Sequence, residues 1–273
     1  MESVSEDNSW NRKLIDPTGI RDKKPRKKGK TMIIDKGMGV NSFRELLETS
    51  GEYIDMVKIG FGTAPLYPQN ILTEKIRLAK LHQVSIFPGG TFLEVAILQK
   101  SVPAFFAMVK KLGFTGVEIS DGTIDMERKY RNELILLALE HNLTVYTEYG
   151  KKLAGSFIEV DDLANTVYWD MEFGAEIVTI EGRESGMDVG IYDEKGKCKD
   201  QVIEKILEKV SNHANLMWEA PLKTQQVHLI KTLGPQIHIG NVSPLDILSL
   251  EALRRGLRSD TLSVIHRFQN VSF

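Results

Sequence analysis

Short apolar runs rich in Val and Ile recur along the chain from residue 31 onward. Each run has the length and the β-branched content of a buried strand, and most end in glycine or a charged residue. Eight such runs are present, at residues 31–37, 56–62, 84–90, 116–122, 144–150, 177–183, 216–221 and 237–244. The pattern therefore predicts eight strands spread evenly over the chain.

The segments between these runs have the spacing of amphipathic helices, for example at residues 42–51, 73–82, 127–141 and 162–174. Strands that alternate with helices must be parallel, because each helix returns the chain to the same end of the sheet. Eight units in roughly 240 residues match the size of a closed (β/α)8 TIM barrel, an α/β fold. An open doubly wound sheet is the alternative, but neither "DKGMGV" nor "KIGFGTAP" has the G-x-G-x-x-G spacing of its dinucleotide-binding turn.

We assign residues 31–273 to a single barrel and residues 1–30 to a short, partly ordered N-terminal extension. The extension ends in "RDKKPRKKGK", residues 21–30, with seven basic residues and one acid. A basic arm can bind nucleic acid, but this one has no interleaved aromatic residues for base stacking. We therefore expect a solvated linker.

Composition excludes several other classes of protein. The chain is 42% hydrophobic and 26% charged, which is typical of a globular domain, and 35 Lys and Arg nearly balance 37 Asp and Glu. This balance favours neither nucleic acid nor membrane as a partner. Cys198 is the single cysteine, and no signal-peptide pattern or membrane-length apolar run is present, so we expect a cytoplasmic protein without disulfides.

Charged residues follow nearly every predicted strand. In "IVTIEGRESG", residues 177–186, a buried strand runs directly into Glu181, Arg183 and Glu184, which for one isolated strand is explained equally well by a solvated turn. In a barrel, however, the carboxyl ends of all strands converge on one rim, where active sites are built. The residues expected there are Asp35, Lys36, Lys58, Glu118, Asp121, Glu148, Lys151, Lys152, Glu181, Arg183 and Glu219.

Both signs of charge at that rim predict a metal and an anionic substrate. Carboxylates suit a hard cation such as Mg²⁺, whereas the 6 histidines form no H-E-x-x-H or H-x-H pair for zinc. Lysine and arginine are the usual clamps for carboxylate and phosphate groups. A metal with a cationic clamp is how enzymes hold an enolate derived from a carboxylic acid.

Eight motifs in order, "DKG", "VKIGFGT", "PGGT", "EISDG", "TEYGKK", "EGRESG", "EAPLKTQQ" and "LEALRRGLRSDT", closely resemble the phosphosulfolactate synthase family from about residue 31 to residue 261. The resemblance implies a TIM-barrel lyase associated with coenzyme M biosynthesis. Such an enzyme adds sulfite to phosphoenolpyruvate with Mg²⁺ and forms (2R)-phospho-3-sulfolactate. Its substrates are two small anions, and we expect a homo-oligomer.

The resemblance also implies residue roles. The second lysine of "TEYGKK", Lys152, corresponds to the general acid, and we expect neighbouring cations to lower its pKa. We assign Arg183 to anion clamping and catalysis, Lys36 and Lys58 to further anion contacts, and Glu118, Glu148 and Glu181 to the metal. Each carboxylate or cation is alternatively a partner that orients a neighbour. We do not assign Arg254, Arg255 and Arg258 to the site, because their segment is alternatively a helix that packs on the barrel or on an adjacent subunit.

Two other functions are compatible with the sequence. Phe61 and Ala64 replace the family's common Trp and Ser, and Tyr149, His238 and Gly240 also depart from its pattern, which indicates reshaped pocket walls. A related lyase with another enol acid or nucleophile is therefore one alternative. A non-catalytic, stress-associated barrel acting through protein contacts is the other. The long segment 184–200 is interpreted equally as an active-site lid or as a passive surface excursion.

Overall fold

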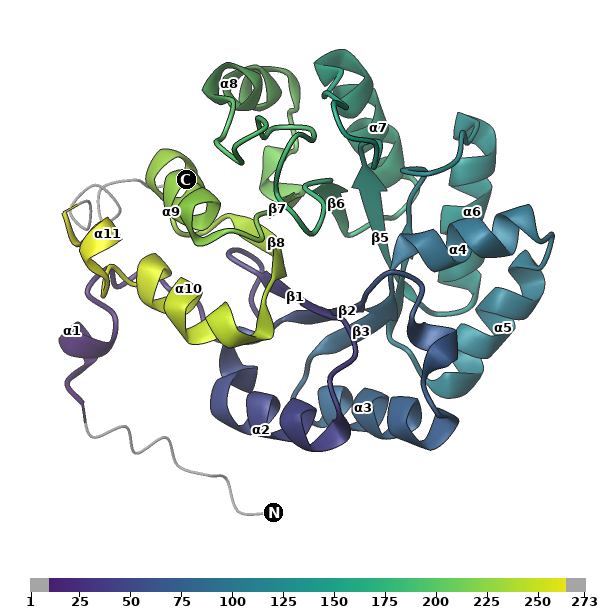
Figure 1. Ribbon diagram of the computed structural model, residues 1–273, viewed down its shortest axis with the longest axis horizontal. Helices are drawn as coiled ribbons and strands as arrows, with labels where there is room; N and C mark the ends of the chain where they lie inside the picture. Colours follow the sequence, from purple (N-terminus) through teal and green to yellow (C-terminus); the bar gives the residue numbers. More distant parts are fainter. Residues whose placement is uncertain (1–9, 264–273) are drawn as a thin grey trace.

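A computed structural model of the chain describes residues 10–263, and the predictions for residues 1–9 and 264–273 lie outside the described residues. Figure 1 shows the strands in the centre of the molecule with the helices around them. All eight strands are parallel: β1 (Thr31–Asp35), β2 (Met56–Ile59), β3 (Ser85–Pro88), β4 (Gly116–Ile119), β5 (Thr144–Tyr149), β6 (Ile177–Ile180), β7 (Leu216–Glu219) and β8 (His238–Val242). Each lies inside one of the predicted runs. The predicted (β/α)8 barrel is confirmed.

The sheet runs in the order β3-β2-β1-β8-β7-β6-β5-β4. Its two outer strands, β3 and β4, are brought together by Thr115, whose backbone N–H donates to Ile86 O at 3.0 Å. The Thr115 hydroxyl also accepts from Ile86 N at 2.7 Å and lies 2.8 Å from the Ser85 hydroxyl. These contacts complete a nearly closed barrel.

Helices cover the outside of the sheet and bury one large apolar core against it. The helices that follow successive strands are α2 (Val40–Ser50), α3 (Gln69–Leu81), α4 (Gly90–Leu98) with α5 (Val102–Leu112), α6 (Arg128–Glu140), α7 (Val160–Glu172), α8 (Asp200–Lys209), α9 (Lys223–Leu233), and α10 (Ile247–Arg254) with α11 (Ser259–Leu262). A short helix, α1 (Arg12–Ile15), precedes the barrel. No helix among residues 10–263 is long and apolar enough to cross a bilayer.

The barrel interior has its own small apolar cluster near the amino ends of the strands. It consists of Met32, Met56, Phe87, Tyr146, Ile177 and Met217. Side chains two positions apart along a strand share a face, so the residues that follow these toward the carboxyl end also point inward. The interior therefore has an apolar layer at one end and a place for a second layer at the other.

The basic segment 21–30 is not the solvated linker that we expected. Arg26 is 5% exposed and donates to Asp55 Oδ2 at 3.3 Å and to Glu52 O at 2.7 Å. Lys24 donates to the carbonyl oxygens of Gly51 and His82. These cations are used to fasten the segment to the amino end of the barrel, where carbonyl groups and buried carboxylates are available.

The segment 184–200 is neither a detachable lid nor a passive excursion. Val189, Ile191 and Tyr192 are buried, and Tyr192 donates from its hydroxyl to Glu219 O at 2.5 Å. Gln225 on α9 donates to the carbonyl oxygens of Gly186 and Gly196 at 2.7 and 3.0 Å. The segment is thus a packed part of the core, which its lack of regular periodicity concealed.

Candidate active site

The second interior layer consists of charge. Lys58, Glu148 and Glu219 each lie two positions after an apolar residue of the interior cluster, namely Met56, Tyr146 and Met217. The strand pleat therefore directs these charged side chains into the barrel at its carboxyl end. They line a cavity of about 310 Å³ together with Glu118, Lys152, Glu181, Arg183 and Asn241.

Lys58 is the centre of this cluster. Its ammonium group donates to Glu118 Oε1 at 3.1 Å, Glu148 Oε2 at 3.2 Å and Glu219 Oε1 at 2.7 Å. Burial alone would lower the pKa of Lys58, but the surrounding carboxylates outweigh burial and raise it well above its usual value. Lys58 is therefore protonated and holds carboxylates from three strands together.

Lys152 is the second cation of the cluster. The prediction that the pKa of Lys152 is lowered is wrong. The ammonium group pairs with Glu148 and lies 2.7 Å from Glu181 Oε2. Burial lowers the pKa, but these two carboxylates outweigh burial and raise it above its usual value. The prediction assumed that cations surround Lys152, whereas carboxylates are its nearest neighbours.

The pKa values of the carboxylates are shifted in different directions. Burial, and then the neighbouring Glu148, raise the pKa of Glu118 to about 7. Burial, with the charges of Glu148 and Glu219, likewise raises the pKa of Glu181 well above its usual value. For Glu148, burial is outweighed by Lys152 and Lys58, and the pKa lies below its usual value. The cluster thus has more carboxylates than its two lysines can neutralise.

Backbone N–H groups hold three of the carboxylates in place. Glu118 Oε2 accepts from Gly90 N at the start of α4 at 2.6 Å. Glu219 Oε2 accepts from Gly182 N at 2.9 Å, and Glu181 Oε1 accepts from Arg183 N at 2.6 Å. The other oxygen of each carboxylate accepts from a lysine, which is Lys58 for Glu118 and Glu219 and Lys152 for Glu181.

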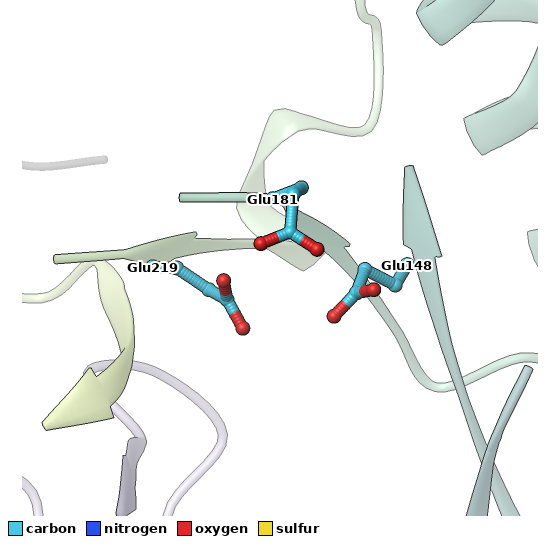
Figure 2. A group of neighbouring side chains, drawn as sticks. All are labelled: Glu148, Glu181 and Glu219. Atoms are coloured by element: carbon cyan, nitrogen blue, oxygen red, sulfur yellow. The ribbon is translucent and has the colours of Figure 1, made fainter. Parts of the chain in front are cut away.

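This arrangement fits a divalent cation. Glu148, Glu181 and Glu219 each offer an oxygen within 4.8 Å of the others, and all three residues are buried. Figure 2 shows the three carboxyl groups directed toward a common space. Four carboxylates and two ammonium groups leave the ionised cluster with a formal charge of −2. Oxygen ligands with a net charge of this sign suit Mg²⁺.

The structure brings most of the predicted site residues together. Glu118, Glu148, Glu181, Lys58, Lys152 and Arg183 all line the cavity. Lys36 does not line it and instead pairs with Glu184 on the exposed rim. Asp35 is also at the carboxyl end, but it pairs with the buried Lys75 and caps the β1–α2 turn through Met38 N at 2.8 Å.

Sequence reasoning missed Ser120 and Glu94, and it did not include Glu219 among the candidate metal residues. Glu219 was predicted only at the rim, although its place after Met217 on a buried strand was a usable signal for an oxygen beside Glu148 and Glu181. The Ser120 hydroxyl lies 2.9 Å from Glu148 Oε1 and 3.0 Å from Glu94 Oε1 on α4. Glu94 is a buried helix residue, and no strand-end pattern indicates it.

Comparison with known proteins identifies the family of this chain. A model of the (2R)-phospho-3-sulfolactate synthase family matches residues 20–260. The chain is 40% identical to a phosphosulfolactate synthase of Methanothermobacter thermautotrophicus over 91% of this chain and 97% of that protein. It is 36% identical to the phosphosulfolactate synthase of Methanocaldococcus jannaschii over 87% of this chain and 95% of that protein. The Arabidopsis thaliana protein HEAT-STRESS-ASSOCIATED 32 is 26% identical over 90% of this chain and 92% of that protein.

Solved structures show the fold. The YdjI aldolase of Escherichia coli K12 superposes with a TM-score of 0.54 at 11% identity, over 89% of this chain and 86% of that one. At this identity the likeness concerns the barrel alone. With the family model over residues 20–260 and the identities to curated relatives, the chain belongs to the (2R)-phospho-3-sulfolactate synthase family of enzymes.

Proposed function

We propose that this enzyme is a Mg²⁺-dependent lyase that adds sulfite to phosphoenolpyruvate and releases (2R)-phospho-3-sulfolactate. The observation that carries the proposal is the cluster of four buried carboxylates with Lys58 and Lys152 inside the rim cavity. Its excess negative charge suits a divalent cation, and Arg183 beside it suits an anion. Family membership supplies the identity of the substrates.

The reaction has two bond-making steps. The sulfur lone pair of sulfite forms a bond to the methylene carbon of phosphoenolpyruvate, and the π electrons of the C=C bond move into the carboxylate as an enediolate. The carbon that bears the phosphate then takes a proton from one face, which fixes the R configuration. No oxidant or leaving group is required.

Glu148, Glu181 and Glu219 are the residues that we propose to hold the metal, and Glu118 stays a further candidate from the sequence. The ion would supply positive charge to stabilise the enediolate oxygens. The backbone bonds to Glu118, Glu181 and Glu219 fix these side chains before substrate arrives, so little reorganisation is needed during the reaction.

Lys152 is the proposed proton donor. Its raised pKa keeps the ammonium group protonated at neutral pH, which an acid catalyst requires in its resting state. The enediolate carbon is a strong base, so an ammonium group with a raised pKa is still able to donate to it. Its 27% side-chain exposure lets solvent restore the proton after each turnover.

Arg183 is the proposed anion clamp. Its guanidinium forms no ion pair with the part of the chain that the structure describes, in contrast to Lys152 and Lys58 beside it. A free guanidinium in a cavity is ready to form two parallel hydrogen bonds with an oxyanion. Lys58 is held by three carboxylates, so we propose that its role is to position them and not to contact the anion.

The direct test is product formation. The purified enzyme is mixed with phosphoenolpyruvate, sulfite and Mg²⁺, and phosphosulfolactate is sought by mass spectrometry. We expect the product only in the complete mixture, with each component omitted in turn as a control. Product formed from another enol acid but not from phosphoenolpyruvate would replace this proposal with a related lyase activity.

A further inference from the structure

Three residues that line the cavity have an unusual backbone conformation. Phe61, Arg183 and Asn241 have φ values of 54°, 55° and 54°, in the left-handed region that favours glycine. Phe61 and Arg183 follow β2 and β6, whereas Asn241 lies within β8, next to its last residue. Such conformations each cost on the order of 1 kcal/mol or more and cluster at functional sites. Of the three, only Arg183 has a role in the mechanism described above, and Asn241 is the polar residue without one.

A bulge in β8 determines where Asn241 points. β8 pairs with β1 through Thr31 with Ile239 and Ile33 with Val242, so β8 has one residue more than β1 between these pairs. Ile239 and Val242 both belong to the outer core, whereas regular alternation would place residues three apart on opposite faces. The extra residue thus turns Asn241 inward to the cavity. Bulges are common beside active sites because they redirect a side chain.

The Asn241 side chain has capacity for a ligand. The residue is only 5% exposed, yet its Oδ1 is buried without a hydrogen-bond partner among the described residues. A buried carboxamide without a partner costs free energy, so such groups are usually paired in native structures. Because Asn241 also lines the cavity, a ligand bound there can supply a partner to its carboxamide.

We propose that Asn241 is a substrate-binding residue that donates a hydrogen bond from its carboxamide to an oxyanion of phosphoenolpyruvate. This inference rests on the proposed function. Phosphoenolpyruvate carries oxyanions and no strong donors, so the NH2 end of the carboxamide is the useful one, and a half-turn about χ2 presents either end. The carboxamide is neutral. It can therefore bind an anion beside Arg183 without cancelling the negative charge of the carboxylates that are proposed to hold the metal ion.

The other ligand that this side chain could take is the metal ion, through Oδ1. The two roles respond differently to Asn241→Gly. Loss of a metal ligand would weaken Mg²⁺ binding to the substrate-free protein, whereas loss of a substrate contact would leave Mg²⁺ binding unchanged. Mg²⁺ titration of the substrate-free protein therefore separates them without any activity measurement.

The main test uses Asn241→Gly, which keeps the left-handed backbone free of strain and removes only the carboxamide. We expect the KM for phosphoenolpyruvate, and its dissociation constant by calorimetry in the presence of Mg²⁺, to rise about 10- to 100-fold. The kcat should change by less than about threefold, and the affinity for Mg²⁺ alone should stay the same. The Asn241→Asp variant, whose carboxylate repels the substrate oxyanion, should lose more phosphoenolpyruvate affinity than Asn241→Gly.

Asn142→Gly is the matched control. Asn142 has nearly the same φ, 58°, but it is exposed, just before β5 and far along the strand from the rim. Its substitution should leave the kinetics and phosphoenolpyruvate affinity unchanged. Wild-type phosphoenolpyruvate affinity in Asn241→Gly, or weaker Mg²⁺ binding by that variant, overturns the inference while the proposed function stands. A wild-type enzyme that forms no phosphosulfolactate overturns the proposed function itself.

Discussion

The two ends of the barrel both hold buried charges, but they use them differently. At the amino end, Arg26 binds Asp55, Arg21 binds Glu251, and Arg254 donates to the carbonyl oxygens of Pro235 and Ile237. Each cation there has a carboxylate or a carbonyl from another segment as its partner. At the carboxyl end, four carboxylates surround two lysines next to an open cavity.

The difference shows which buried charges indicate a function. Buried ion pairs with matched partners fasten one segment to another, and removal of one member leaves an uncompensated charge. A cluster with surplus charge of one sign instead destabilises the ligand-free fold, and a bound ligand of opposite charge removes this repulsion. The raised pKa values of Glu118 and Glu181 are the physical sign of that surplus. Substitutions at the two ends should therefore have separable consequences.

The largest effect should follow Lys152→Ala at the carboxyl end. Loss of a general acid typically lowers the rate about 10²- to 10⁴-fold, so we expect kcat to fall in this range. Phosphoenolpyruvate binding should be largely retained, as measured by calorimetry. Lys151→Ala is the neighbouring control, because Lys151 donates to Asp121 O and Ile124 O outside the cluster. Near-normal turnover in Lys152→Ala would remove the assigned role.

At the amino end, Arg26→Ala should affect stability without affecting chemistry. The variant leaves Asp55 buried without its cation, which should lower the free energy of unfolding by about 3–5 kcal/mol in chemical denaturation. The kinetic constants of the folded protein should equal those of wild type. Lys27→Ala, at an exposed position in the same segment, should change stability by less than about 0.5 kcal/mol. A kinetic defect in folded Arg26→Ala would contradict the separation of the two ends.

Arg183→Ala tests whether the guanidinium holds an anion. Loss of a hydrogen bond to a charged group should raise the KM for phosphoenolpyruvate or sulfite about 10- to 100-fold. The melting temperature should change little, because Arg183 forms no ion pair within residues 10–263. Lys195→Ala, an exposed cation in the same segment, serves as the control. A stability loss with normal kinetics would show a structural role instead.

The smallest effect concerns the pH dependence of stability. The folded pKa of Glu118, about 7, lies above its ordinary value of 4.5, so its protonated form stabilises the metal-free fold. That contribution is complete below pH 4.5 and is lost as the pH rises through 7. Glu118→Gln should therefore flatten the fall in unfolding free energy across this range, in denaturation without Mg²⁺.

Glu48→Gln, at an exposed position on α2, is the control and should leave that slope unchanged. Because the raised pKa leaves Glu118 partly protonated near neutral pH, we expect Mg²⁺ binding to the wild type to release protons. Calorimetry in buffers of different ionisation enthalpy measures this release directly. A slope in Glu118→Gln identical to that of wild type would contradict the assignment of the raised pKa.

Much of this protein is determined by its sequence alone. The eight apolar runs and the helical segments between them are local patterns, and connection by helices permits only parallel strands. The convergence of Lys58, Glu148, Glu181 and Lys152 follows from that topology, because strand ends meet at one rim. The period-2 pleat also determines that residues two positions after interior apolar residues point inward.

Only the tertiary structure decided which charged groups contact one another. The pKa of Lys152 depends on a carboxylate in β5 and one just after β6, and the direction of the pKa shift changes with the sign of the nearest charge. The packing of Arg26 on Asp55 and the inward turn of Asn241 depend on segments distant in sequence and on a shift of strand register. Periodicity reports which face a residue occupies over a few positions, whereas electrostatic energy depends on distances of a few ångströms between separate strands. The sequence therefore located the site, and the fold determined its protonation and its ligands.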